Sequence, residues 1–529
     1  MKAAAPPHNL HRGQPTARKR PLAPPMDGRA YAIAALLTGL ALVLRLYRID
    51  DQSYWTDELY TVIHIREGVG RIVAAGFVSE TNPPLYYILL RGWAALFGDG
   101  EIATRSLSAI LGALTVPVLI ATGSILGSRR AGYIAALIFA AAVVEIEYDQ
   151  ETRQYALLAL GLSVALLGLA QALARMNQEG TPPRRAGLLF AGGIVLAVYS
   201  QDVAVVYWLA MNLSLAACFF GAGKITGPKA VQFLRAWALY NAAAIVLVAP
   251  QLYAIAALRD APSVAWIPYA SWGSLLVGLE GTLFTHLPSP DSPAVLAGLS
   301  AASAAIIWAA HANRNRRLVM TLGLLLPVLA FASFVAISAF RPIMLIRTLI
   351  WFPVPLYLLV GFAIAGVADP MRRAAAIVVA LAFAAAAMAV DWPNASKENW
   401  REAVRSVASA AGPGDIIGFF PDESSFDAFA YYWPGGFDAA RCRVLAEVDQ
   451  PPTGSGSGRP LPACERAGVE TLVRGAVEQG HALWLVARGL NIPGLVRFSS
   501  SLPHQINVRG RQWVSTRDSF MIVRIGGVK

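Results

Sequence analysis

Charged residues are scarce in this sequence. Asp, Glu, Lys and Arg together make up 15% of its 529 residues, whereas an average soluble domain has about a quarter. The apolar content of 56% and the mean hydropathy of +0.50 indicate a membrane protein instead. The formal net charge of +11 does not indicate nucleic-acid binding, because the basic residues are spread over short segments and form no basic face of a soluble domain.

Cysteine is also rare, with three residues in the whole sequence. Cys218 falls inside an apolar run and is expected to be inert. Cys442 and Cys464 fall in the polar C-terminal part, where an oxidising compartment would permit a disulfide between them. No two cysteines have the spacing of a metal site. The C-terminal part has no glycine-rich phosphate loop and no nucleophile motif, so no catalysis is assigned to it.

Long apolar runs are what the sequence has in abundance. A helix that crosses a membrane needs about 20 mostly apolar residues, and eleven such runs are predicted to be spans. They are 29–47, 106–126, 130–147, 153–174, 186–201, 203–221, 232–256, 292–311, 317–339, 343–366 and 373–391. A further apolar stretch near 270–285 could be another span, a re-entrant segment or a surface helix.

Basic residues occur in the N-terminal tail and in every second loop. They are Lys2, Arg12, Arg18, Lys19 and Arg20, then Arg129 and Arg130, Arg175, Arg184 and Arg185, Lys224 and Lys229, Arg314, Arg316 and Arg317, and Arg372 and Arg373. The positive-inside rule predicts that these segments, the N-terminus included, are cytoplasmic. An odd number of spans then places the C-terminal part outside. Three parts are predicted: a disordered tail 1–28, a membrane body 29–391 and an external domain 392–529.

Helix and strand patterns alternate along residues 392–529. Helices are predicted at 399–411, 426–432 and 469–478, and strands at 415–420, 481–487 and 519–525. This alternation is typical of a small α/β domain.

Two adjacent carboxylates, Asp57 and Glu58, follow the first span in the segment WTDELYT. Neighbouring acids in a partly desolvated cleft raise each other's pKa, which suits a general base. The alternative is that they cap the helix that follows, where acids complement the helix dipole. This loop, 48–105, is long enough for two helices, predicted from Asp57 to about Ala75 and from Pro84 to Phe97, the second of them interfacial.

A second group of ionisable residues lies in EYDQETRQYALL, residues 147–158. Asp149 and Arg153 are four residues apart, as are Glu151 and Tyr155, so on a continuous helix each pair would share a face. Ionisable residues at the membrane boundary are functional candidates. The alternative for Asp149 and Arg153 is an ordinary helix ion pair.

Five further residues are candidates for ligand contacts. Asn82 precedes two prolines that hold the chain rigid, and Tyr86 follows them. Arg341 and Arg347 flank the outer end of the tenth predicted span, where an Arg could bind phosphate through paired donors or extend to lipid headgroups. Asp202 lies in the turn after the fifth span, outside the membrane on the predicted topology.

Five segments occur in an order that resembles a known family: WTDELYT, NPPLYYILL, GEIATRSLSAILGALTVPVL, GSRRAGYIAALIFAAA and YDQETRQYALLAL. The sequence is similar to the bacterial members of glycosyltransferase family 39, relatives of protein O-mannosyltransferases and of the lipid A aminoarabinose transferase. The resemblance covers about residues 30–210 and continues loosely through the Arg347 region. The segment NWREAVRSVASAAGPGD resembles the start of the external domain of many bacterial members.

The resemblance implies a polytopic α-helical membrane protein with the C-type glycosyltransferase fold and a small external α/β domain. It also implies a glycosyltransferase of a bacterial inner membrane with a periplasmic C-terminal domain. The donor would be a polyprenyl-phosphate-linked hexose or pentose, and the acceptor a lipid, a glycan or a protein. No nucleic acid would take part.

The resemblance also assigns roles to residues. Asp57, with Glu58 beside it, matches the family's acid and would deprotonate or hold the acceptor hydroxyl. The family's QE-x-R-x-Y segment matches Gln150, Glu151, Arg153 and Tyr155, and Arg153 and Arg347 would neutralise the lipid phosphate as it leaves. Beyond the family match, we predict that Arg341 also binds the donor phosphate. The residues predicted to contact the sugar or the acceptor are Asn82, Tyr86, Asp149, Glu151, Tyr155 and Asp202.

Two departures from the family pattern leave the metal and the acceptor open. Relatives often have His before the paired prolines, where this chain has Asn82, and His in the turn that here contains Asp202. A divalent metal cofactor is therefore neither assigned nor excluded. Two other functions remain as alternatives: a transporter or flippase of lipid-linked saccharides, and a non-catalytic assembly subunit. Transport is disfavoured because the polar residues gather at the outer ends of the spans and no repeated halves are found.

Overall fold

A computed structural model describes most of the chain. The described residues are 25–78, 82–179, 182–220, 228–257, 271–282, 293–391, 397–420, 424–435, 442–445, 465–467, 480–488, 506–513 and 520–527. The predicted helix at 469–478 and Cys464 lie outside these residues, so the predicted disulfide with Cys442 stays a prediction. Cys218 is buried inside a helix, as expected.

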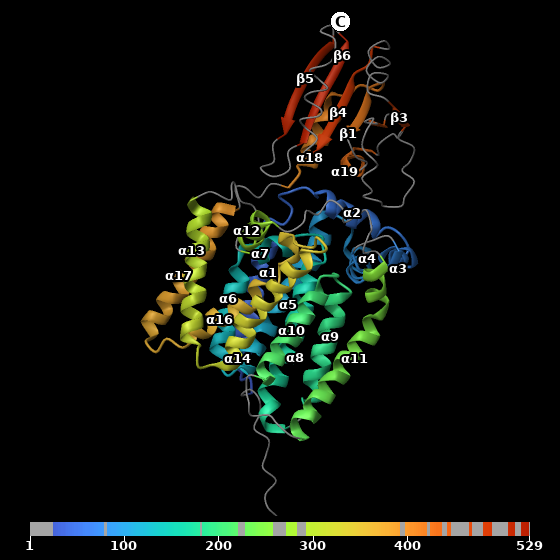
Figure 1. Cartoon of the computed structure of the whole chain (residues 1–529). Coiled ribbons are helices and arrows are strands. Elements are labelled where there is room, and N and C mark those ends of the chain that lie inside the picture. Colours follow the sequence, from blue (N-terminus) through green and yellow to red (C-terminus); the bar gives the residue numbers. More distant parts are fainter. Residues whose placement is uncertain are drawn as a thin grey trace, which may run out of the picture.

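The membrane body is a bundle of long apolar helices (Figure 1). Its helices are α1 (Gly28–Leu46), α5 (Glu101–Ile125), α6 (Arg129–Ala141), α7 (Val143–Asp149), α8 (Tyr155–Glu179), α9 (Arg184–Val198), α10 (Ala204–Phe220), α11 (Pro228–Ala257), α13 (Pro293–Ala312), α14 (Arg317–Met320), α15 (Leu326–Ser338), α16 (Pro353–Ala365) and α17 (Pro370–Asp391). A π-helical turn at Thr321–Leu325 joins α14 to α15.

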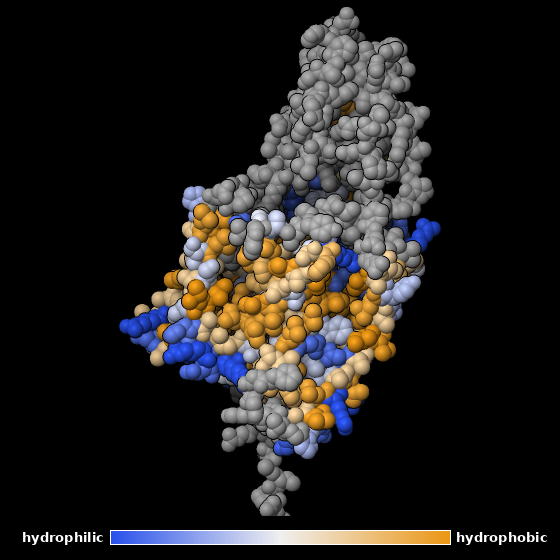
Figure 2. Space-filling view, in the orientation of Figure 1, coloured by the Kyte–Doolittle hydropathy of each residue, from blue (hydrophilic) through white to orange (hydrophobic). Residues whose placement is uncertain are grey.

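Seven helical segments of the described chain are long and apolar enough to cross a membrane, or eight if α6 and α7, which meet at 61°, form one broken span. The other three predicted spans fall on α9, α10 and α16, which have 15, 17 and 13 residues. Figure 2 shows a broad apolar belt around the body with hydrophilic residues gathered below it. Leu239 and Val246 on α11 are 70% and 72% exposed, as expected for side chains that face lipid. The chain is a multi-pass membrane protein.

The tenth predicted span begins later than expected. Residues 343–352 form no continuous helix; a 3-10 turn covers Ile346–Thr348, and α16 begins at Pro353. Proline favours the first helical position because its missing N–H has no intrahelical partner there. Arg347 therefore lies in an irregular segment before α16 and not on the span itself.

The first external loop contains α2 (Thr56–His64), α3 (Val69–Val78) and α4 (Leu85–Phe97). The prediction of one helix from Asp57 to about Ala75 was wrong, because the chain breaks between α2 and α3. Arg91 on α4 holds this break: its Nη1 donates to the carbonyl oxygens of Ile65 and Glu67, at 2.6 Å each. The second predicted helix corresponds to α4.

One short helix, α12 (Trp272–Glu280), corresponds to the uncertain stretch near 270–285. At 1.5 Å per residue its nine residues extend about 14 Å, which is half of a bilayer core. Among the described residues this stretch therefore contains a short re-entrant or surface helix and no complete span.

The C-terminal part contains a six-stranded sheet with two helices. Its elements are α18 (Trp400–Ala410), β1 (Ile416–Phe420), α19 (Ser424–Tyr432), β2 (Cys442–Leu445), β3 (Glu465–Ala467), β4 (Leu483–Arg488), β5 (Ile506–Trp513) and β6 (Phe520–Gly527). The strand order is β3-β2-β1-β4-β6-β5, with β1 parallel to β2 and β4, and β6 antiparallel to β4 and β5. The strands β2, β3 and β5 were not predicted.

The C-terminal part lies at the same end of the bundle as α2, α3 and α4 (Figure 1). An apolar cluster joins the two: Tyr54, Leu59 and Val62 in and before α2 pack with Trp400 on α18 and Phe429 on α19. The helix α2 is thereby held between the membrane body and the C-terminal part.

Candidate functional site

The site begins at the first turn of α2, which contains both predicted acids. Trp55 is the N-cap, so Asp57 and Glu58 are the second and third residues of the helix. Successive residues on a helix point about 100° apart, and the two carboxylates accordingly meet different surroundings. Asp57 is partly exposed, whereas Glu58 is fully buried.

Asp57 lies between two arginines from distant parts of the chain. Its Oδ2 is 2.7 Å from Nη1 of Arg347 and 4.0 Å from Nη2 of Arg153. The side chains of Asp57 and Arg347 are 29% and 24% exposed, so both can be reached from outside. The structure thus brings together the three residues that the sequence analysis singled out as acid and phosphate ligands.

Arg153 is held more firmly than Arg347. Its Nη1 donates to the Asp57 carbonyl oxygen at 3.1 Å and to Oγ1 of Thr61 at 3.0 Å. It also hydrogen-bonds the buried hydroxyl of Tyr155. Arg153 is 5% exposed, so it forms the inner wall of the site.

Glu58 is buried and fully hydrogen-bonded, unlike Asp57 beside it. Its two carboxylate oxygens accept from Nε and Nη2 of Arg105 at 2.8 and 2.7 Å, and the N–H of Thr152 donates to Oε1 at 2.8 Å. Burial alone would raise the pKa of Glu58, but the positive charges of Arg105 and Lys397 and these hydrogen bonds lower it to about 2. A carboxylate so strongly held ionised is a poor proton acceptor.

Arg105 and Lys397 are site residues that the sequence analysis missed. Arg105 also donates to the backbone carbonyls of Ile49, Gln52 and Ser53, and thereby anchors the chain before α2. Arg105 stands at the start of an apolar span, and Lys397 at the start of the C-terminal part. Neither position showed a local pattern that indicated a partner.

The segment 147–158 is not one continuous helix, which corrects the predicted pairing of Asp149 with Arg153. The helix α7 ends at Asp149 and α8 begins at Tyr155. Asp149 instead lies 2.6 Å from Nε of Arg45 on α1, and both side chains are buried. The break turns Arg153 toward α2 and leaves Asp149 inside the bundle.

Glu151, in the same break, faces Lys397 with 3.4 Å between Oε1 and Nζ. Burial raises the pKa of Glu151; Lys397 and Arg153 oppose this increase, and the negative charges of Glu58 and Asp57 add to it. Glu151 is thus one of two buried acids beside the site that share one ammonium group.

Asn82 contacts the site through Gln154, whose Nε2 donates to Oδ1 of Asn82 at 2.7 Å. Gln154 directly follows Arg153, so Asn82 lies next to the wall of the site. Tyr86 has a different position from the one expected of a ligand-binding residue. It is fully buried, and its hydroxyl forms a 2.7 Å hydrogen bond with Ser108 on α5.

Asp202 and Arg341 form a separate polar group near the outer end of α11. Oδ1 of Asp202 accepts from Nε2 of Gln251 at 2.9 Å, and Arg341 donates to the Ile255 carbonyl oxygen. Burial raises the pKa of Asp202 to about 7, although the Gln251 hydrogen bond and the Arg341 charge oppose it. Among the contacts of the described residues, none joins Arg341 to Asp57.

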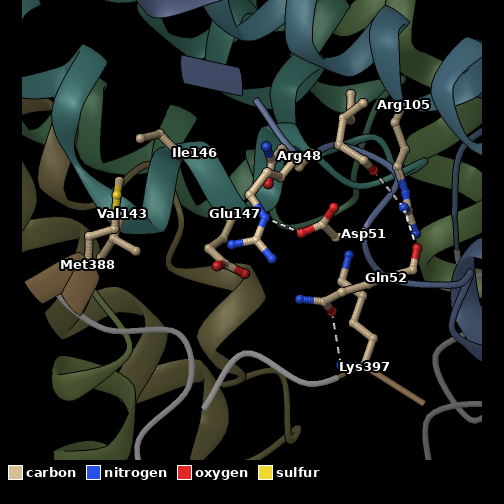
Figure 3. Close-up of a pocket in the computed structure, with 11 residues that line it drawn as sticks. Arg48, Asp51, Gln52, Arg105, Val143, Ile146, Glu147, Met388 and Lys397 are labelled. Atoms are coloured by element: carbon tan, nitrogen blue, oxygen red, sulfur yellow. Dashed lines mark hydrogen bonds and ion pairs between the residues drawn. The ribbon is translucent and has the colours of Figure 1, made fainter. Parts of the chain in front are cut away.

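A small polar cavity of about 30 Å³ lies between residues that include Arg105 and Lys397 (Figure 3). Its lining includes Arg48, Asp51, Gln52 and Glu147, together with Arg105 and Lys397, which also contact Glu58. Three cationic and two carboxylate side chains line it, and its volume suits about two water molecules. Within the described residues, no three His, Cys, Asp or Glu side chains are placed to hold a metal ion.

Comparison with known proteins places this geometry in a known fold. No protein-family model and no curated protein sequence matches the chain. The crystal structure of ArnT from Cupriavidus metallidurans in the apo state matches with a TM-score of 0.59 at 13% identity, over 93% of this chain and 98% of that one. The same protein bound to undecaprenyl phosphate matches with a TM-score of 0.58 at 13% identity, over 94% of this chain and 98% of that one. An Archaeoglobus fulgidus oligosaccharyltransferase tethered with an acceptor peptide matches with a TM-score of 0.49 at 15% identity, over 77% of this chain and 63% of that one.

The match to ArnT extends over nearly the full length of both chains. The fold is therefore the C-type glycosyltransferase fold, as the resemblance implied. This likeness defines the architecture, and the site described above lies at the end of the bundle that faces the C-terminal part (Figure 1).

Proposed function

We propose that this protein is a membrane glycosyltransferase. It transfers a sugar from a polyprenyl-phosphate-linked donor to an acceptor hydroxyl on the extracytoplasmic side of a bacterial inner membrane. The observation that carries the proposal is the partly exposed carboxylate of Asp57 between Arg347 and Arg153, at the outer end of a bundle with the ArnT fold. One of the matching ArnT structures binds undecaprenyl phosphate, and the same class of lipid fits two arginines at a membrane surface.

The ion pair between Asp57 and Arg347 suggests how donor binding prepares the site. The Asp57 carboxylate is 2.7 Å from Arg347, and both side chains are partly exposed. A donor phosphate has more oxygens and more charge than a carboxylate and would compete for the guanidinium. Binding of the phosphate to Arg347 would thus release Asp57, with Arg153 fixed nearby by Thr61.

The released carboxylate of Asp57 then accepts the proton of the acceptor hydroxyl. The hydroxyl oxygen forms a bond to the anomeric carbon, and the bond between that carbon and the phosphate oxygen breaks. The electron pair stays on the lipid phosphate, whose added negative charge Arg347 and Arg153 stabilise.

The sugar and the acceptor are proposed to contact the side of the site near Asn82. Asn82 is half-buried and lies beside Arg153 through Gln154. Asp202 and Arg341 are proposed to contact a more distant part of a substrate, since they belong to a separate polar group. Asp149, Glu151, Tyr155 and Tyr86 are buried and paired inside the protein, so we assign them to the framework of the site.

The test is sugar transfer in proteoliposomes supplied with undecaprenyl-phosphate-linked hexose and pentose donors and with lipid, glycan and peptide acceptors. Asp57→Asn should reduce transfer by at least about a thousandfold, since the general base and its charge are both lost. Asp50→Asn is the matched control, because Asp50 is an exposed acid of the same loop. Full activity of Asp57→Asn would refute the mechanism. Movement of the donor across the bilayer without sugar release would indicate a transporter instead.

A further inference from the structure

Three buried ionisable groups meet behind α2. Nζ of Lys397 is 3.4 Å from Oε1 of Glu151 and 3.7 Å from Oε2 of Glu58. The exposed fractions of the Lys397 and Glu151 side chains are 10% each, and that of Glu58 is zero. Lys397 comes from the C-terminal part, whereas both acids belong to the membrane body.

Lys397 is held in this position by its surroundings. Its N–H donates to Oε1 of Gln52 at 3.0 Å. The next residue, Glu398, accepts from the hydroxyls of Ser53 and Thr56 at 2.6 and 2.8 Å, through its carbonyl oxygen and its Oε2. The same Oε2 accepts from the indole N–H of Trp400 at 2.5 Å. The start of the C-terminal part is thus joined to the chain that leads into α2.

The charges of this cluster depend on Lys397. Arg105 neutralises Glu58, whereas Glu151 is a second buried carboxylate beside it, with Lys397 as its ion-pair partner and Arg153 as a weaker positive influence. A buried charge without a partner is strongly destabilising. The single ammonium group of Lys397 is shared by the two acids and favours the ionised form of each.

The two acids stand next to the residues of the proposed reaction. Glu58 directly follows Asp57 on α2, and Glu151 lies two residues before Arg153. Lys397 therefore connects the segment that carries the base to the segment that carries a phosphate ligand. We propose that Lys397 is a positioning residue, through which the C-terminal part sets the distance between Asp57 and Arg153. This inference depends on the proposed function for its catalytic consequence.

Lys397 also makes a specific pH dependence expected. The charged groups that face Glu151 are Lys397, Glu58, Arg153 and Asp57. Without the ammonium group, Glu151 would stay protonated to a higher pH, because burial and the two negative neighbours already favour its neutral form. In Lys397→Met, α2 should be held correctly at low pH and displaced as Glu151 ionises. Activity of this variant should therefore fall as pH rises, over a range in which the unaltered protein is constant.

The experiment compares four full-length variants in proteoliposomes: Lys397→Met, Lys397→Arg, the double variant Lys397→Met with Glu151→Gln, and the control Arg405→Met. Arg405 is exposed on α18. For each variant, kcat and the KM for the lipid-linked donor are measured between about pH 5.5 and pH 9. Hydrogen exchange of residues 56–64 is measured on the same preparations.

Lys397→Met should lower kcat by about tenfold to a hundredfold with KM for the donor within about twofold, because a displacement of about 1 Å is enough for such a loss. Lys397→Arg and the double variant should keep most of the activity of the unaltered protein. In the double variant, activity should no longer fall as pH rises. Equal losses in the single and double Met variants would overturn the inference, as would an unchanged pH profile of Lys397→Met.

The hydrogen-exchange readout separates the two proposals. Faster exchange of α2 in Lys397→Met, with recovery in the double variant, would support the positioning role even if the unaltered protein transferred no sugar. In that case the proposed function alone would have failed. Unchanged exchange of α2 in Lys397→Met would overturn the positioning role whatever the activity.

Discussion

Replacement of Glu58 by Gln tests whether this acid is a framework residue. The pKa of Glu58 falls from an ordinary value of 4.5 to about 2, mainly because Arg105 and Lys397 outweigh the effect of burial. At about 1.4 kcal/mol per pH unit, this difference corresponds to about 3 kcal/mol of stabilisation. Gln keeps the shape of the side chain and removes the charge, so α2 should be less stable by about that amount.

Hydrogen exchange of residues 56–64 measures this loss directly. A loss of about 3 kcal/mol raises the population of the open form about a hundredfold, so the amides of α2 should exchange about a hundredfold faster in Glu58→Gln. As a single variant, Arg105→Met should lower the stability of α2 by about 3 to 5 kcal/mol, because Glu58 would then be buried with Lys397 as its remaining cation. The double variant should lose less than the sum of the two single variants.

The same reasoning gives a pH dependence with a definite sign. A carboxylate with a lowered pKa contributes its stability above the ordinary value of 4.5, and this contribution is lost as pH falls toward 2. Exchange of α2 in the unaltered protein should therefore accelerate, relative to the intrinsic rate, below about pH 4.5. Glu58→Gln should lack this acceleration. Asp50→Asn serves as the control, and exchange of Glu58→Gln within about twofold of the unaltered protein would refute the reasoning.

Two further variants test the phosphate ligand and the buried ion pair in the bundle. Arg347→Gln should weaken binding of undecaprenyl phosphate about tenfold to a hundredfold, because one charge-assisted hydrogen bond is lost. Titration of the purified protein with the lipid measures the affinity, and an unchanged affinity would show that Arg347 does not bind the phosphate. Asp149→Asn should lower the stability of the bundle by about 3 to 5 kcal/mol, because Arg45 would remain buried without its carboxylate at 2.6 Å; the change in Tm in nanodiscs measures this, and an equal Tm would show that the ion pair contributes nothing.

The sequence was sufficient to predict the architecture and the three central residues. Each predicted span falls on a helix or on the bent pair α6 and α7, because apolar length is a property of a short stretch of sequence. Asp57, Arg153 and Arg347 could be named because charged residues near a membrane are costly, and because the family resemblance connected them. The structure then placed both arginines within 4.0 Å of the Asp57 carboxylate.

The partners of the buried charges could not be predicted. Helical spacing paired Asp149 with Arg153, but the chain breaks after Asp149, and its partner is Arg45, 104 residues earlier. Lys397 lies more than 240 residues from Glu151 in the sequence, so no local pattern connects them. Such pairs depend on how the helices pack, and periodicity within one helix contains no information about that packing.

The difference between Asp57 and Glu58 follows from how each pairs with arginine. A partly exposed ion pair contributes about 1 kcal/mol or less, so an incoming phosphate can replace Asp57 on Arg347 at small cost. A buried pair with two hydrogen bonds and a backbone donor cannot be opened without leaving a charge unpaired, so Glu58 stays on Arg105. Adjacent acids in one helical turn thus have opposite properties: Glu58 holds the helix in place, whereas the partly exposed Asp57 is the one that we propose exchanges its arginine for a substrate.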